Sequence, residues 1–197
     1  MEKKQLRDQL LKTRKALSAQ FVEEKSRVLV SRFKDEIPIA PNSVVHLFRS
    51  VTKFNEVNTQ LFLDWLFQER NDIRIALPRV VDQTRTLDHH LHTLGDTLVP
   101  SRWGIEEPMS TAPKIEPMEI DVVIVPLLGL DRQGYRIGYG GVFYDKFLSQ
   151  TRPDCRKIGI AFDQAFQEQP LPIDEFDVPL DAVVTPTGVF HFSSSTK

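Results

Sequence analysis

The chain has 197 residues, of which 41% are hydrophobic and 26% charged, with a formal net charge of −2. This composition suits one globular domain and argues against the global basic field of a nucleic-acid-binding protein. A single cysteine excludes an internal disulfide framework and fits a reducing compartment. No apolar run is long enough to cross a membrane, and the start lacks the apolar segment of a signal peptide, so we expect a cytoplasmic location.

The amino-terminal segment predicts two amphipathic helices. Leucines recur at spacings of three, four and seven over residues 3–17, and a second apolar face lies between Ser18 and Pro38. The first helix carries three cations that are neighbours on one side: Lys3, Arg7 and Arg14. This basic end is either a solvated face or an anion site, and charge alone favours the solvated face.

Strands and helices then alternate along the chain. Apolar or alternating runs predict strands at residues 43–48, 72–77, 85–94, 121–125, 156–162, 181–186 and 188–192. Periodic segments predict helices at residues 58–70 and 143–150. Residues 95–118, with four prolines, have the composition of a loop. This alternation predicts a three-layer α/β fold, in which helices flank a mostly parallel central sheet.

Three histidines in the predicted strand 85–94 could suggest a metal site. Strand geometry would place His90 and His92 on one face and His89 on the other. Because no cysteine or suitably spaced third ligand accompanies them, a polar strand face is favoured over a metal centre.

The segment 121–148, "DVVIVPLLGLDRQGYRIGYGGVFYDKFL", contains five of the chain's nine glycines, and four of them, Gly134, Gly138, Gly140 and Gly141, lie close together before a predicted helix. Ligands of open α/β sheets collect beyond the carboxyl ends of strands, and glycines let backbone N–H groups approach a phosphate. The following helix start and Arg136 add positive charge. The segment matches neither the dinucleotide fingerprint nor the Walker loop, so a plain turn and a phosphate loop remain equal alternatives on this evidence.

Asp145 favours the phosphate loop, because Mg²⁺ beside a phosphate takes one or two carboxylate ligands. A second acid could come from the cluster "PIDEFDVPLD" at residues 172–181. The alternatives for these acids are a residue that complements the helix dipole and an acidic surface loop.

Six segments spread along nearly the whole chain carry a family resemblance: "KKQLR", "NEVNT", "LPRV", "RWGIEEP", "VPLLGLDRQGYRIGYGGVFYDKFL" and "VPLDAVVTP". In this order they resemble the 5-formyltetrahydrofolate cyclo-ligases, also called methenyltetrahydrofolate synthetases. The resemblance implies a single cyclo-ligase domain over residues 1–197. It also implies a Rossmann-like fold of the NagB/RpiA/CoA transferase kind. The expected partners are small molecules only, with no nucleic acid or membrane, and the expected state is a monomer or weak dimer.

The resemblance implies an enzyme that uses ATP and Mg²⁺ to convert 5-formyltetrahydrofolate into 5,10-methenyltetrahydrofolate, with release of ADP and phosphate. In the family's reaction the formyl oxygen attacks the γ-phosphate. The N10 amine then attacks the imidoyl phosphate, and phosphate leaves. This chemistry depends on in-line positioning and neutralisation of phosphate charge more than on acid–base groups. The cations, glycines and carboxylates of this chain suit it.

Carried over position by position, the resemblance assigns two segments to ATP: Lys3, Lys4, Gln5, Leu6 and Arg7, then Arg136, Ile137, Gly138, Tyr139, Gly140, Gly141, Val142, Phe143 and Tyr144. The catalytic cations in this set would be Lys4, Arg7 and Arg136. The folate contacts would be Val51, Glu56, Trp103, Tyr139 and Phe143. The metal ligands would be Asp145 and Asp177.

Some of these positions carry open alternatives. The stretch around Val51 appears about two residues longer than usual in the family, which leaves Phe54 as an alternative folate contact. Trp103 could line the pocket or belong to the core. Val142 stands where the family usually has glycine, and we expect an ordinary backbone there, with the valine only narrowing the site.

Three other functions compete with the cyclo-ligase. A sugar-phosphate isomerase or CoA-transferase relative would use the same loop for phosphate and a carboxylate such as Glu56 as base. A folate-binding or regulatory protein would bind without turnover. A nucleic-acid module has only the basic amino end in its favour. The order of the motifs favours the cyclo-ligase.

Overall fold

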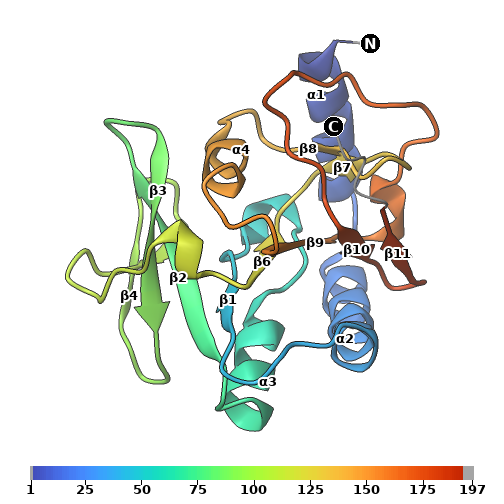
Figure 1. The fold of residues 1–197 in the computed structure, drawn as a ribbon. Coiled ribbons are helices and arrows are strands. Elements are labelled where there is room, and N and C mark those ends of the chain that lie inside the picture. Colours follow the sequence, from blue (N-terminus) through green and yellow to red (C-terminus); the bar gives the residue numbers. More distant parts are fainter. Residues whose placement is uncertain (1, 193–197) are drawn as a thin grey trace.

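The computed structural model describes residues 2–192, and its centre is a seven-stranded sheet in the order β11-β10-β9-β6-β1-β2-β3 (Figure 1). The strands are β1 (Val44–His46), β2 (Arg74–Val81), β3 (Thr86–His92), β6 (Val122–Val125), β9 (Arg156–Ile160), β10 (Ala182–Val184) and β11 (Val189–His191). The five inner strands are parallel, and the two edge strands, β3 and β11, are antiparallel to their neighbours. The predicted mostly parallel sheet is therefore confirmed.

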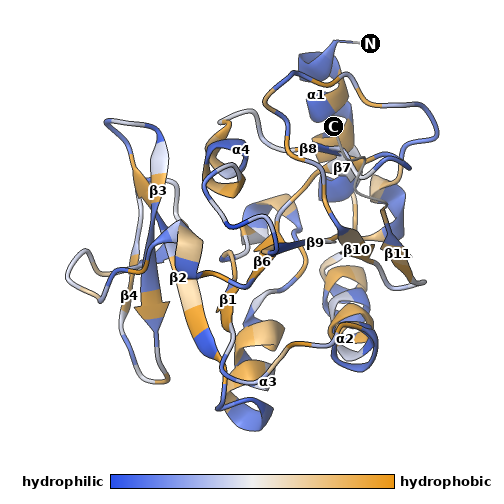
Figure 2. Ribbon diagram, viewed as in Figure 1, coloured by the Kyte–Doolittle hydropathy of each residue, from blue (hydrophilic) through white to orange (hydrophobic). Residues whose placement is uncertain are grey.

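Helices cover both faces of this sheet, as the alternation of elements predicted. One core joins α2 (Ala19–Glu36) and α3 (Gln60–Glu69) to the first face, with Phe33, Phe62 and Leu66 almost fully buried. The other core joins α4 (Phe143–Leu148) to the opposite face through Phe147 and Leu148. The hydropathy colouring shows hydrophobic residues along one side of α2 and over much of α3 (Figure 2). The three layers follow from this burial on two faces.

Helix α1 (Lys3–Lys15) lies apart from both main cores. It packs on a small hairpin formed by β7 (Gly129–Leu130) and β8 (Arg136–Ile137), through a separate cluster of buried side chains: Leu6, Leu10, Leu128, Ile137 and Leu171. Figure 1 shows α1 beside this hairpin, away from α2 and α3. The leucine spacing seen in the sequence thus buries one stripe of α1 and leaves its other sides for polar contacts.

Short elements complete the fold. A hairpin of β4 (Leu98–Pro100) and β5 (Glu106–Pro108) occupies part of the segment predicted as a loop. Three 3-10 turns span Thr52–Phe54 (η1), Pro117–Glu119 (η2) and Asp163–Ala165 (η3). Within residues 2–192, no helix combines the length and the apolarity that crossing a membrane requires.

The histidines of β3 correct one expectation. His89, His90 and His92 are all buried, so the strand has no solvated histidine face. His89 packs against Phe147 of α4, with ring centroids 4.0 Å apart, and His92 lies near Phe67 of α3. Because α4 and α3 cover opposite faces of the sheet, both faces of this edge strand are enclosed.

Candidate active site

A cleft of about 540 Å³ lies beyond the carboxyl ends of the parallel strands. Its floor includes Phe48 and Arg49 after β1 and Pro126 after β6, which is where open α/β sheets bind ligands. The cleft gathers most of the residues that the sequence analysis selected: Lys3, Arg7, Val51, Glu56, Trp103, residues 136–145 and Asp177. Segments from the start, middle and end of the chain therefore meet in one place.

Three residues of the predicted ATP set lie elsewhere. Lys4 and Gln5 are exposed on other sides of α1, and Leu6 is buried against the β7–β8 hairpin. The helical period explains the division, because Lys3 and Arg7 are one turn apart and share the side that faces the cleft. Any role of Lys4 in binding stays a prediction.

The glycine loop, residues 138–142, forms one wall of the cleft, and the side chain of Arg7 approaches its backbone closely. Arg7 reaches across to it and donates a hydrogen bond from Nε to the carbonyl oxygen of Gly138, at 3.2 Å. Gly140 has φ +91°, and a Cβ there would lie 3.2 Å from the Arg7 guanidinium carbon. Glycine at position 140 thus satisfies both the backbone conformation and the space beside Arg7.

Val142 overturns the expectation of an ordinary backbone. It adopts the left-handed conformation, with φ 58° and ψ 10°, immediately before α4. This region is strained for any residue with a Cβ and most of all for a β-branched side chain. The usual glycine of the resembled family is therefore explained by φ, and this chain carries a strained valine in its place.

Arg136 and Asp145 form the innermost ion pair of the cleft. Arg136 is only 4% exposed, and its Nη2 atom lies 2.8 Å from Oδ1 of Asp145. Burial lowers the pKa of the Arg136 guanidinium, while the Asp145 carboxylate acts against that change. Arg136 also donates to the carbonyl oxygen of Val178 at 2.5 Å, which fixes its orientation.

A second ion pair joins α1 to the acidic segment. Nζ of Lys3 lies 2.6 Å from carboxylate oxygens of both Asp174 and Asp177. Burial alone would lower the pKa of Lys3, but the two carboxylates outweigh it and the pKa is raised. Together, Lys3, Arg7, Arg136, Asp145 and Asp177 make up what we call the cation end of the cleft.

The carboxylates of the cation end could hold a divalent ion only with help from a ligand. Asp145 and Asp177 both line the cleft. Over residues 2–192, no group of three or more histidine, cysteine, aspartate or glutamate side chains is arranged to hold a metal. Mg²⁺ typically binds through one or two carboxylates, waters and substrate phosphates, so two acids beside a phosphate loop fit it.

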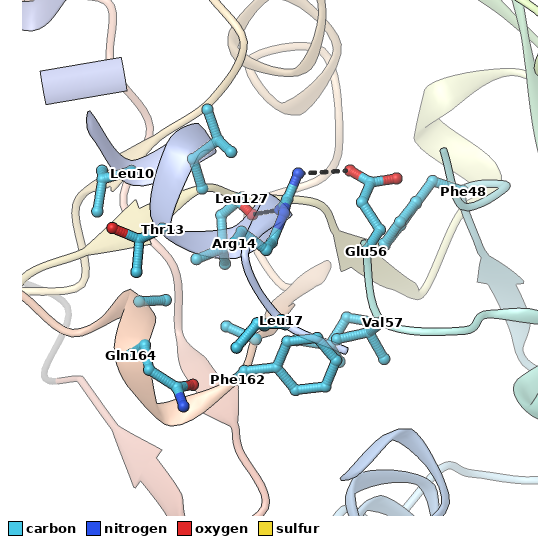
Figure 3. A pocket seen from close by; sticks show the side chains of 14 residues that line it. Leu10, Thr13, Arg14, Leu17, Phe48, Glu56, Val57, Leu127, Phe162 and Gln164 are labelled. Atoms are coloured by element: carbon cyan, nitrogen blue, oxygen red, sulfur yellow. Dashed lines mark hydrogen bonds and ion pairs between the residues drawn. The ribbon is translucent and has the colours of Figure 1, made fainter. Parts of the chain in front are cut away.

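Glu56 marks the other end of the cleft, which we call the Glu56 end. Its side chain is only 4% exposed, and burial raises the pKa of its carboxyl group. Oε2 accepts a hydrogen bond from the backbone N–H of Val51 at 2.6 Å, and Oε1 accepts one from the hydroxyl of Tyr139 at 2.5 Å. Arg14 lies 3.7 Å from the same Oε1 atom (Figure 3).

Two open alternatives at this end are now clearer. Trp103 is 50% exposed and lines the cleft, so the core interpretation is wrong for this tryptophan. Val51 and Phe54 both line the cleft, and the Phe54 ring stacks on Tyr139 with centroids 5.5 Å apart. The structure therefore places both candidate folate contacts, Val51 and Phe54, on the same wall of the cleft.

The sequence analysis missed Arg14 as a site residue. Its only local signal was its place on the same side of the first helix as Lys3 and Arg7. Its partners, Glu56 and Tyr139, are distant in sequence. The exposed Phe176, which also lines the cleft, gave no motif signal at all.

Comparison with known proteins identifies the family of the chain. The sequence model of the 5-formyltetrahydrofolate cyclo-ligase family matches residues 1–186. The chain is 30% identical to the 5-formyltetrahydrofolate cyclo-ligase of Escherichia coli K12 over 181 residues, which is 91% of this chain and 97% of that protein. It is 29% identical to the enzyme of the same name from Mycoplasma pneumoniae, over 93% of this chain and 98% of the relative.

Solved structures give the same result for the fold. The NMR structure of Aquifex aeolicus 5,10-methenyltetrahydrofolate synthetase superimposes with a TM-score of 0.82 and 25% identity, covering 100% of this chain and 96% of that one. The synthetase from Mycoplasma pneumoniae gives a TM-score of 0.74 and 26% identity, covering 94% and 99%. From the match over residues 1–186 and these full-length likenesses, the chain belongs to the 5-formyltetrahydrofolate cyclo-ligase family of enzymes.

Proposed function

We propose that the protein converts 5-formyltetrahydrofolate into 5,10-methenyltetrahydrofolate and that the reaction consumes ATP in the presence of Mg²⁺. The observation that carries the proposal is the convergence of α1, the glycine loop and two carboxylates on one cleft that also contains Glu56. The family and the names of its relatives support the same reaction.

The cation end is suited to bind the triphosphate. Lys3, Arg7 and Arg136 present positive charge along one side, and Gly138 leaves open space where a side chain would stand, so a ligand can approach the backbone closely. In the ligand-free chain these cations are balanced by carboxylates or backbone carbonyls. A bound triphosphate would take the place of Asp174 at Lys3 and would add to the contacts of Arg7 and Arg136.

Asp145 and Asp177 would hold Mg²⁺ together with phosphate oxygens. The ion, when bound, supplies neutralisation of the charge that develops during phosphoryl transfer. The chain's own contribution is to place both carboxylates beside cations, Asp145 at Arg136 and Asp177 at Lys3.

Glu56 and the wall of Val51, Phe54 and Trp103 are suited to the folate. A planar heterocycle with N–H donors would pair with a buried carboxylate and stack on aromatic rings. Held there, the formyl oxygen would face the γ-phosphate. Its attack forms the bond to phosphorus and releases ADP. The N10 amine then attacks the formyl carbon, phosphate leaves, and the N10 proton is lost.

In this reaction the protein acts mainly through position and charge. Arg136, fixed by Asp145 and the Val178 carbonyl, would stabilise negative charge on the transferring phosphoryl group. Three cations grouped at this end, Lys3, Arg7 and Arg136, suit phosphoryl transfer, which needs no dedicated nucleophile on the enzyme.

A turnover assay tests the proposal. Purified protein is mixed with 5-formyltetrahydrofolate and Mg²⁺, with and without ATP, and the near-ultraviolet band of the methenyl product is followed. We expect a rise that depends on ATP and disappears in Asp145→Ala. Folded protein that binds the folate by calorimetry but shows no rise would instead support the non-catalytic binding function.

A further inference from the structure

We propose that Arg14 is a positioning residue that holds Glu56 and Tyr139 in place for the folate. The inference deepens the proposed function and rests on it, because it concerns how the Glu56 end of the same cleft is built. It follows from the contacts of the arginine, which connect four segments that are distant in sequence.

The guanidinium of Arg14 is used at every nitrogen. Its Nε atom donates to the carbonyl oxygen of Phe54 at 2.8 Å, and Nη1 donates to that of Leu127 at 2.9 Å. Nη2 donates to the hydroxyl of Tyr139 and lies 3.7 Å from Glu56. Only 12% of the side chain is exposed. A planar fork with its donors aimed at four groups fixes all of them relative to α1.

A second connection between α1 and this segment is made by Asn55, the residue before Glu56. Asn55 adopts a left-handed conformation, with φ 50°, and its side-chain amide donates to carbonyl oxygens at the end of α1. The shortest of these bonds, to Leu17, is 2.8 Å. Asn55 thus satisfies carbonyls that a helix end would otherwise leave without partners. The segment that carries Glu56 is therefore anchored twice, by the Arg14 side chain on the Phe54 carbonyl and by the Asn55 side chain on carbonyls at the end of α1.

The Arg14–Glu56 pair lies in mostly apolar surroundings, where the interaction between two charges is stronger than in water. Arg14 and Glu56 both line a second, smaller cavity of about 30 Å³, whose other walls are mostly apolar, including Leu17, Phe48 and Phe162 (Figure 3). The charged and titratable groups that face Glu56 are Arg14 from α1, Tyr139 from the glycine loop and Tyr144 from α4. Of these, only Arg14 is a cation.

A buried carboxylate next to a single cation depends on that cation for its ionised form. Burial already raises the pKa of Glu56, and Arg14 and Tyr139 act to lower it. Removing the arginine charge would raise the pKa further, so Glu56 would take up a proton closer to neutral pH. A protonated carboxyl offers the folate one acceptor fewer, and binding would weaken as the pH falls.

The arrangement also links the two ends of the cleft. Lys3, Arg7 and Arg14 lie on one side of α1, and eleven residues of helix span about 16 Å. One helix therefore presents cations to the phosphates at one end and holds the folate contact at the other.

The test compares three variants in the turnover assay: Arg14→Gln, Arg14→Lys and, as a control, Lys12→Gln. Lys12 is an exposed cation on the same helix, outside the cleft. For Arg14→Gln we expect the KM for 5-formyltetrahydrofolate to rise about tenfold, the value of one charge-assisted contact, with the KM for ATP changed less than about twofold. The folate KM of Arg14→Gln should also rise more steeply than that of wild type as the pH falls, because the Glu56 carboxylate loses the cation that lowers its pKa.

Arg14→Lys separates charge from shape. Lysine keeps the positive charge but cannot reach all four acceptors, so the folate KM should rise while its pH dependence stays that of wild type. An unchanged folate KM in Arg14→Gln, or an equal rise in the KM for ATP, would overturn the proposal. The same pH dependence in the two variants would overturn the role of the charge.

Two further measurements keep the test decisive. If Arg14→Gln melts below the assay temperature, Arg14→Lys carries the test, and an unchanged folate KM in that variant overturns the proposal. If wild type shows no turnover, the proposed reaction fails, and calorimetry of 5-formyltetrahydrofolate binding to wild type and Arg14→Lys still tests the positioning role. Equal affinities would then overturn it.

Discussion

The cation end and the Glu56 end of the cleft hold their charges in different ways. At the cation end, Lys3 pairs with Asp174, which is half exposed, and with Asp177, which is 14% exposed. At the Glu56 end, the carboxylate and Arg14 are 4% and 12% exposed. Exposed ion pairs contribute little to stability and can exchange for a ligand, whereas breaking a buried pair leaves a desolvated charge. The Lys3–Asp174 pair of the cation end is therefore suited to exchange, whereas the Glu56 end, like the buried Arg136–Asp145 pair, is suited to fixed position.

The ends also rest on different layers. The Glu56 end adjoins the core of α2 and α3, where Phe48 and Val57 are packed among aliphatic and aromatic side chains. The cation end lies above α4, whose Tyr144 and Phe147 pack against His46. His46 is fully buried and neither of its ring nitrogens has a hydrogen-bond partner among the described residues. The four variants that follow probe these differences, in order of decreasing effect.

The largest effect is expected from Arg136→Gln. This change removes the buried cation that we propose stabilises the transferring phosphoryl group, so turnover should fall by about 10²–10³-fold. The KM for ATP should rise more than the folate KM, the reverse of the Arg14 variants. Steady-state kinetics with each substrate varied in turn measures both.

Controls for Arg136→Gln separate folding from catalysis. Arg132→Gln removes an exposed cation paired with Glu168 and should leave turnover unchanged. The double variant Arg136→Gln with Asp145→Asn replaces the buried ion pair by two neutral amides. It should regain stability relative to Arg136→Gln but no activity. Recovery of activity in the double variant would contradict the proposed role of Arg136.

The histidines beneath the cation end predict an acid-sensitive fold. Burial lowers the pKa of His89 from 6.5 to about 4, and it also lowers the pKa of His46 and His92. The unfolded chain therefore binds more protons below pH 6.5. Stability is fully present above that pH and is lost as the pH falls towards 4, by about 3 kcal/mol from His89 alone.

Urea unfolding between pH 7.5 and pH 4 measures this loss. His89→Leu, a change of similar volume, should remove about 3 kcal/mol of the pH dependence. The exposed His191 gives the matched control, because His191→Leu should leave the dependence as in wild type. If His89→Leu and His191→Leu both lose stability with falling pH as steeply as wild type, His89 is not the source of the pH dependence.

A smaller effect is expected from Val142→Gly in the loop between the two ends. Relief of left-handed strain, about 1–2 kcal/mol, exceeds the entropy that glycine loses on folding, about 0.5–1 kcal/mol. The net gain of about 1 kcal/mol should raise the melting temperature by about 2–4 °C. Val142→Ala keeps a Cβ and should gain less. A fall in melting temperature for the glycine variant would show that Val142 is held without strain.

The smallest effect is expected from Asp174→Asn at the cation end. The Lys3–Asp174 pair is half exposed, so unfolding free energy should change by less than about 0.5 kcal/mol. Because Asp174 competes with phosphate for Lys3, the KM for ATP should stay level or fall slightly. Asp177→Asn is the contrasting variant, since loss of a proposed metal ligand should raise the Mg²⁺ concentration needed for turnover. Equal responses of the two variants would contradict their different roles.

Local patterns predicted the regular elements well. Of the predicted strand 121–125, Val122–Val125 form β6, because four consecutive apolar side chains need cover on both faces, which an inner parallel strand receives. The β4–β5 hairpin was not predicted, because three-residue strands lack a period and owe their pairing to tertiary contacts. The histidines of β3 looked like a polar face, since alternation alone does not reveal that α3 and α4 cover an edge strand.

The site was predictable to the extent that its residues lie in contiguous segments. The glycine loop, Arg136 and Asp145 stand within ten residues of one another, and the structure places them together. The Arg14–Glu56 pair joins residues that no local spacing connects. Val142 adopts a left-handed backbone that valine rarely takes. Local sequence preference therefore predicts the wrong conformation, and only the path of the folded loop shows the right one.

The separate packing of α1 has a consequence for how the molecule opens. This helix contacts the rest of the chain through a few leucines and isoleucines, plus the polar contacts of Lys3, Arg7, Arg14 and Asn55. Elements with few buried apolar contacts open locally at a free energy below that of global unfolding. The backbone amides of α1 should then exchange hydrogen sooner than those of α2. Ligands that contact both ends of α1 should slow the hydrogen exchange of its amides towards the rate of α2.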